Sequence, residues 1–123
     1  MNVQKLPESL ALDYFKFWNS QDLESLRGIF TNDVVLSDWE IYKCGIEKVI
    51  AANENIFNNV SNIHANVLSL TVGPKKVIAE LVIDVETLHE DGSLNIASLP
   101  VVDIIQFNNS ETKIKSITAY RRF

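Results

Sequence analysis

The stretch GIEKVIAANENIFNNVSNIHANVLSLTVGP, residues 45–74, changes its hydrophobic period half-way along. Up to residue 60 the apolar side chains recur every three or four positions, which is the spacing along one face of a helix. From there the period falls to two, because Ile63, Ala65 and Val67 alternate with their neighbours as in a half-buried strand. A helix followed by strands predicts an α+β fold, in which the two kinds of element are segregated along the chain.

The residues before this stretch add two helices and a strand to the prediction. Pro7-Glu8 is typical of a helix start, since proline is tolerated in the first turn and an acid is favoured at the positive end of the helix dipole. A second, shorter helix is predicted over residues 23–30. Thr31–Asp33 then predicts a turn, Val34–Leu36 a short strand, and residues 39–44 a loop.

The residues after it predict a series of antiparallel strands. Turn signals at Gly73-Pro74 and Asp91-Gly92 separate alternating segments. The predicted strands cover residues 63–70, 77–86, 95–107 and 113–120. Pro100 lacks an amide donor, which predicts a bulge or a strand edge there. The whole chain, 1–123, is therefore expected to be a single domain with three N-terminal helices on one face of a curved, mostly antiparallel sheet.

Composition excludes several classes of function. The 123 residues carry a formal charge of −5, and 46% of them are hydrophobic, which is typical of a soluble globular domain. The acidic balance argues against nucleic acid and anionic membranes as partners. A single cysteine and the absence of an apolar signal core in the first seven residues predict a cytoplasmic location. His64 and His89 are 25 positions apart, so no metal site is expected.

Asp103 is the residue that departs most from its surroundings. It lies within the predicted strand 95–107, where both strand faces are apolar. Burial in such surroundings disfavours the charged form of a carboxyl. Two interpretations are open at this point. Asp103 is either a structural acid paired with Arg121, Arg122 or Lys115 of the following strand, or a functional acid with a shifted pKa.

Two further residues are candidates for a functional site. Asp38 ends the first predicted strand and is followed by Trp39, whose indole can shield a carboxyl from water. A turn aspartate at the strand end is the alternative interpretation. Tyr14 lies on the inner stripe of the first helix, where it is either a plain core residue or a hydroxyl that faces a ligand.

These residues and the order of elements carry a resemblance to a known family. The stretches Tyr14–Leu26, Phe30–Asp38, Gly45–Ile50, Val102–Phe107 and Lys113–Ile117 are its strongest parts. The chain resembles, over nearly its whole length, the nuclear-transport-factor-2-like superfamily, which includes ketosteroid isomerases and SnoaL-like polyketide cyclases. The resemblance implies a cone-shaped fold with a cavity between the helices and the sheet.

The resemblance to ketosteroid isomerase implies roles for three residues. Tyr14 falls at the position of its oxyanion-hole tyrosine, Asp38 at that of its aspartate base, and Asp103 at that of its protonated aspartic acid. Ionised Asp38 would then remove a proton from a carbon beside a carbonyl, while Tyr14 and neutral Asp103 donate hydrogen bonds to the enolate oxygen. No cofactor is implied.

The ligand implied by this resemblance is a small hydrophobic carbonyl-containing compound. Side chains expected to contact it are Trp18, Trp39, Phe57, Val101 and Tyr120. Trp39 stands where the isomerases usually have proline, and Asn53 stands where a supporting tyrosine would align. The bulky indole and a short loop after Asp38 favour small carbonyl compounds or polyketide-like rings over steroids.

The sequence is compatible with three functions. The first is a cofactor-independent isomerase or cyclase that acts through an enolate. The second is a non-catalytic small-molecule-binding domain that uses the same pocket, and the third is a dimeric protein-association module whose sheet recruits a partner. Since family members often pair through the sheet, and Ile78 and Val82 interrupt an acidic strand face, we also expect a homodimer.

Overall fold

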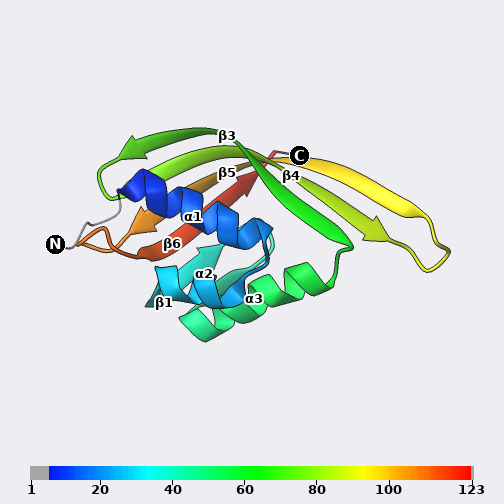
Figure 1. The fold of residues 1–123 in the computed structure, drawn as a ribbon, viewed down its shortest axis with the longest axis horizontal. Coiled ribbons are helices and arrows are strands. Elements are labelled where there is room, and N and C mark those ends of the chain that lie inside the picture. Colours follow the sequence, from blue (N-terminus) through cyan, green and yellow to red (C-terminus); the bar gives the residue numbers. More distant parts are fainter. Residues whose placement is uncertain (1–5, 123) are drawn as a thin grey trace.

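The computed structural model describes residues 6–122, so residue 123 and most of the first seven residues, which were predicted to lack an apolar signal core, lie outside it. Within that range the chain forms three helices and six strands (Figure 1). The helices are α1 (Pro7–Asn19), α2 (Leu23–Ile29) and α3 (Ile46–Asn58). The strands are β1 (Phe30–Ser37), β2 (Tyr42–Cys44), β3 (Asn62–Gly73), β4 (Lys76–Leu88), β5 (Leu94–Phe107) and β6 (Ile114–Arg121).

The helix starts follow from local sequence chemistry. Helix α1 begins at Pro7 and has Glu8 in its first turn, as predicted. Asp22 caps α2, because its side chain accepts a hydrogen bond of 3.1 Å from the Ser25 amide. Gly45 precedes α3 with a φ of 96°, a left-handed conformation that glycine adopts without a steric penalty.

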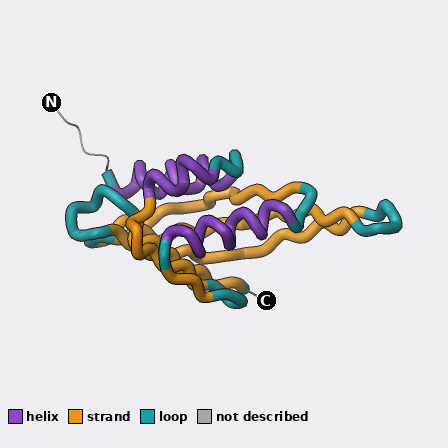
Figure 2. The backbone as a smooth tube through the Cα atoms, turned by 90° about the horizontal axis from the view of Figure 1, so that it is seen from below, coloured by secondary structure: helices purple, strands orange, loops and turns teal. Residues whose placement is uncertain are grey.

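The strands form one sheet in the order β2-β1-β6-β5-β4-β3. All neighbours are antiparallel except β1 and β6, which are parallel. This pairing places the first long strand beside the last one, with Ser37 opposite Thr118. The helices lie along one face of the curved sheet (Figure 2), which confirms the expected α+β cone.

Two local predictions were wrong. Thr31–Asp33 belongs to β1 rather than to a turn, and Tyr42–Cys44 forms strand β2 rather than a loop. The β1–β6 register shifts between Phe30 and Val35, so the turn-like residues occupy an irregular part of the strand. In both cases pairing with another strand, β6 for β1 and the neighbouring β1 for β2, overrides the local propensity of the residues.

Pro100 lies at a strand edge, one of the two predicted outcomes. Its pairing with Val82 of β4 falls in an unbroken register, so no bulge interrupts β4 and β5 there. The Pro100 carbonyl accepts a hydrogen bond of 3.0 Å from the Arg122 amide, just beyond the end of β6. The nitrogen of Pro100, which carries no hydrogen, therefore points toward the side on which β6 ends. No backbone hydrogen bond to a neighbouring strand is required from it there.

The interior between the helices and the sheet holds a dense apolar core. Its largest fully buried side chains include Leu26, Phe30, Ile105, Phe107, Ile114 and Ile117. Beside this core, Trp18 of α1 donates a hydrogen bond of 3.0 Å from its indole Nε1 to Asn53 Oδ1 of α3. The Asn53 amide in turn donates to the Val49 carbonyl at 2.9 Å. The buried Trp18–Asn53 hydrogen bond thus links α1 to α3, and the Asn53–Val49 bond orients the Asn53 side chain.

Replacing Asn53 with alanine is expected to lower the free energy of unfolding by about 1–3 kcal/mol, because the buried indole N–H of Trp18 loses its acceptor. Urea unfolding monitored by circular dichroism measures this loss. Glu54→Ala, at an exposed position of the same helix, is the control and should change stability far less. An equal effect of the two substitutions would show that the hydrogen bond adds no stability.

The outer face of the sheet carries the surface expected to form a homodimer. Ile78 and Val82 of β4 lie half-buried there, beside Val102 and Ile104 of β5. The homodimer stays a prediction, which analytical ultracentrifugation would test. Among the described residues, no helix is long and apolar enough to cross a membrane.

Candidate active site

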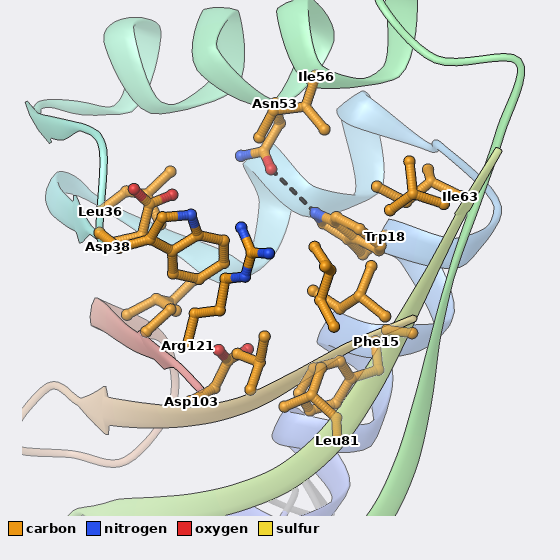
Figure 3. A pocket seen from close by; sticks show the side chains of 18 of the residues that line it. Phe15, Trp18, Leu36, Asp38, Asn53, Ile56, Ile63, Leu81, Asp103 and Arg121 are labelled. Atoms are coloured by element: carbon orange, nitrogen blue, oxygen red, sulfur yellow. Dashed lines mark hydrogen bonds between the residues drawn. The ribbon is translucent and has the colours of Figure 1, made fainter. Parts of the chain in front are cut away.

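A cavity of about 400 Å³ lies between the helices and the sheet (Figure 3). Elements far apart in sequence line it, from α1 to β6. Its apolar wall includes Leu36, Ile56, Ile63, Leu81, Val101 and Ile117. Its polar side chains are Tyr14, Asp38, Glu40, Asn53, Asp103 and Arg121. The fold therefore gathers Tyr14, Asp38 and Asp103, the three predicted site residues, around one mostly apolar space.

Asp103 lies on β5 with 6% of its surface exposed. The residues directly opposite it on the neighbouring strands are Ala79 and Ala119, so no cation lies directly opposite its carboxyl. Burial, and secondarily the charge of Asp38, raises the pKa of Asp103 to about 7. A large fraction of the carboxyl is therefore protonated at neutral pH and can donate a hydrogen bond.

The structural interpretation of Asp103 fails on this geometry. Among residues 6–122, no lysine or arginine forms a salt bridge with its carboxyl. A cation partner would also lower the pKa of Asp103, whereas burial raises it. The carboxyl lines the cavity, and although Arg121 lines it too, no salt bridge joins the two side chains.

Tyr14 reaches the same cavity from α1 and is 5% exposed. Its ring packs against Phe15 and Phe30, at centroid distances of 5.1 and 6.1 Å. Burial, followed by the charges of Asp103 and Asp38, raises the pKa of Tyr14 well above its ordinary value. The phenol thus stays protonated at physiological pH. Within the described chain its hydroxyl makes no hydrogen bond, which leaves it available to a ligand.

Asp38 follows the end of β1, where it is a turn aspartate and also lines the cavity. Its Oδ1 accepts hydrogen bonds of 2.7 and 2.8 Å from the amides of Glu40 and Ile41, so it is a turn aspartate. The same side chain lines the cavity, next to the half-buried Trp39. The two backbone amides fix the orientation of the carboxylate by binding Oδ1, so that Oδ2 can accept from a ligand.

The side chains expected to contact a ligand divide into two groups. Trp18, Trp39 and Val101 line the cavity. Phe57 is buried behind Trp18, with ring centroids 5.3 Å apart, and does not line it. Tyr120 is 60% exposed and lies on the opposite sheet face, because its strand neighbours point into the cavity. The structure therefore does not bring Phe57 or Tyr120 to the cavity surface.

Comparison with known proteins agrees with this architecture. A sequence model of the SnoaL-like domain matches residues 11–117. The chain belongs to the SnoaL-like domain family. No curated protein sequence matches this SnoaL-like protein.

Solved structures share the fold of this SnoaL-like protein at low identity. A Shewanella denitrificans protein provisionally named a SnoaL-like polyketide cyclase is 17% identical, with a TM-score of 0.84 over 94% of this chain and 90% of that one. A Catenulispora acidiphila protein with a ketosteroid isomerase-like fold, solved with trimethylamine, is 16% identical (TM-score 0.77; 90% and 83% covered). A SnoaL-like protein of Agrobacterium tumefaciens, provisionally named an isomerase, is 11% identical (0.73; 94% and 97%). These likenesses confirm the expected fold family.

One cavity residue of this SnoaL-like protein was considered in the sequence only as a structural partner for Asp103. Arg121 of β6 lines the cavity, and its Cζ lies 5.9 Å from the centroid of the Trp39 ring. The alternation of side chains along β6 could have predicted the position of Arg121, since Ile117, Ala119 and Arg121 share the face that lines the cavity. Within the described chain, no three histidine, cysteine or acidic side chains gather as metal ligands would.

Proposed function

We propose that this SnoaL-like protein binds a small apolar carbonyl compound and moves a proton on a carbon next to the carbonyl, through an enolate and without a cofactor. One observation supports this reaction more than any other. Two buried groups, the Tyr14 hydroxyl and the Asp103 carboxyl, face a mostly apolar cavity, and neither hydrogen bonds to a described residue. Buried polar groups are normally paired, so their partner is expected to be a ligand atom.

The two donors suit an oxygen on which negative charge develops. A carbonyl oxygen placed near both groups would accept one hydrogen bond from Tyr14 and one from protonated Asp103. As a proton leaves the adjacent carbon, the oxygen becomes an enolate and both hydrogen bonds strengthen. The apolar surroundings reduce screening, which increases the benefit of the two donors.

Asp38 supplies the base in this mechanism. Its carboxylate takes the proton from carbon as the electron pair of the C–H bond moves into the enolate. In an isomerase the protonated Asp38 returns the proton to a different carbon; in a cyclase the enolate carbon attacks a second carbonyl of the same ligand, whose oxygen receives the proton. The turn at Glu40 and Ile41 holds the base in one orientation throughout.

The donor pair can be tested with 2-naphthol, a phenol that mimics an enolate. Tyr14→Phe and Asp103→Leu should each weaken its binding by about tenfold or more, because each variant removes one hydrogen bond to the phenolic oxygen. Both tryptophans of the chain line the cavity, so intrinsic fluorescence reports occupancy directly. Tyr120→Phe, on the opposite sheet face, is the matched control and should bind like wild type. Unchanged affinity in both cavity variants would refute the donor role.

A non-catalytic binding domain is the second candidate, because the two hydrogen bonds from backbone amides to Asp38 are also those of an ordinary turn aspartate. Deuterium uptake separates the two candidates. A panel of small aryl ketones is incubated with the protein in deuterated buffer, and mass spectrometry measures exchange of the protons next to the carbonyl. Uptake faster than in buffer supports the reaction. Tight binding of these ketones without uptake would favour the binding domain.

A further inference from the structure

Arg121 is the one cavity cation among the described residues, and the proposed proton transfer does not use it. Its place follows from strand register. Val101 lies opposite Arg121 and Asp103 opposite Ala119, so Arg121 and Asp103 are diagonal neighbours on the same sheet face. Figure 3 shows its side chain rising past Asp103 into the cavity, toward Trp18.

The setting of the guanidinium favours a planar anionic group. A guanidinium remains charged at every physiological pH, and its coplanar N–H donors match the two oxygens of a carboxylate. Its carbon lies 5.9 Å from the centre of the Trp39 ring, within the range of a cation–π contact. The indole therefore helps to hold the cation in the cavity wall, where water screens it less than at the surface.

The other charged side chains that line the cavity oppose a bound anion only weakly. Asp38 carries a negative charge, but two backbone amides donate to it and offset part of that charge. Glu40 is exposed, so solvent screens it. Tyr14 and protonated Asp103 are neutral donors that attract electron-rich oxygen. No titratable side chain of α3, β3 or β4 lines the cavity.

We propose that Arg121 determines ligand specificity by binding a carboxylate, so that the cavity selects apolar keto acids over the corresponding neutral ketones. The carbonyl oxygen of such a ligand lies against Tyr14 and Asp103, and the carboxylate pairs with the guanidinium. This assignment rests on the proposed function for the placement of the carbonyl. The selectivity itself requires only binding, which allows it to be tested separately from turnover.

Two probes that differ only in a carboxylate test the proposal: 6-acetyl-2-naphthoate and 2-acetonaphthone. Wild type should bind the keto acid about tenfold or more tightly than the ketone, measured by tryptophan fluorescence and by calorimetry. Arg121→Gln should remove this preference and leave ketone affinity within about twofold, whereas Arg121→Lys should retain part of it. Potassium chloride should weaken keto-acid binding only. Arg122→Gln, which removes the same charge at the adjacent, exposed position, is the matched control and should keep the wild-type preference.

Three results would overturn the proposal. The first is the same ratio of keto-acid to ketone affinity in wild type and Arg121→Gln, and the second is an equal loss of affinity for both probes in Arg121→Gln. The third is tighter binding of the ketone than of the keto acid by wild type. Thermal unfolding verifies that the variant is folded. The same ketone has exchangeable protons beside its carbonyl. If it binds without deuterium uptake while the carboxylate preference follows Arg121, the proton-transfer function fails and the specificity assignment stands.

Discussion

Replacing Asp103 with asparagine is expected to abolish a loss of stability that the wild-type protein suffers between pH 4 and pH 7. The pKa of Asp103 rises from 3.8 in the unfolded chain to about 7 in the cavity. Between these values the folded protein binds more protons than the unfolded chain, so its stability falls as pH rises. The two pKa values correspond to about 4 kcal/mol, fully lost above pH 7.

Urea unfolding at a series of pH values measures this effect. The difference in unfolding free energy between Asp103→Asn and wild type should grow in favour of the variant from pH 4 to pH 7 and then stay level. Subtracting the two curves cancels the opposite contributions of Asp22 and Asp91, whose pKa values are lowered by hydrogen bonds from Ser25 and Ser93. Asp33→Asn, at an exposed site, should give a nearly flat difference. A flat difference for Asp103→Asn as well would contradict a buried, neutral carboxyl.

Replacing Asp38 with asparagine should slow deuterium uptake by the ketone that wild type exchanges fastest by about 10²–10⁴-fold, because the variant lacks the general base. The amide oxygen of asparagine can still accept from Glu40 and Ile41, so the turn and the cavity shape are retained. Binding of the ketone should therefore change only a few-fold.

Exchange rates from mass spectrometry and affinities from tryptophan fluorescence separate these two effects. Asp33→Asn removes one exposed carboxylate and should leave exchange at the wild-type rate. If Asp38→Asn exchanges as fast as wild type, another group takes the proton and the assignment of the base is wrong. If exchange and binding fall together, Asp38 acts on binding rather than on the chemical step.

The elements with strong periodicity were predictable from sequence, and those that depend mainly on pairing with another strand were not. Helix α3 and strand β4 bury one regular stripe or face, which the spacing of apolar residues records. Strand β2 is three exposed residues long and exists because it pairs with β1. Its sequence therefore carries no periodic signal, and neither do the exposed residues of β1 before Val34.

The candidate site was predictable to a similar degree. The apolar residues around Asp103 indicated its burial, and the family resemblance suggested Tyr14 and Asp38 beside it. That alanines flank Asp103 on both sides depends on the register of three strands, which no local pattern specifies. The same register turns Arg121 into the cavity and Tyr120 out of it. One residue of slip would exchange the two.

A buried carboxyl that is protonated near neutral pH is the feature on which the proposed chemistry depends. Carbon-detected NMR of protein labelled at the aspartate side-chain carboxyls follows its titration, and Asp103→Asn assigns the signal. A midpoint near pH 7 for Asp103 is expected, because burial and the charge of Asp38 both favour the protonated form. A midpoint near the ordinary value of 3.8 would mean that the carboxyl is ionised at neutral pH and cannot donate a hydrogen bond to an enolate.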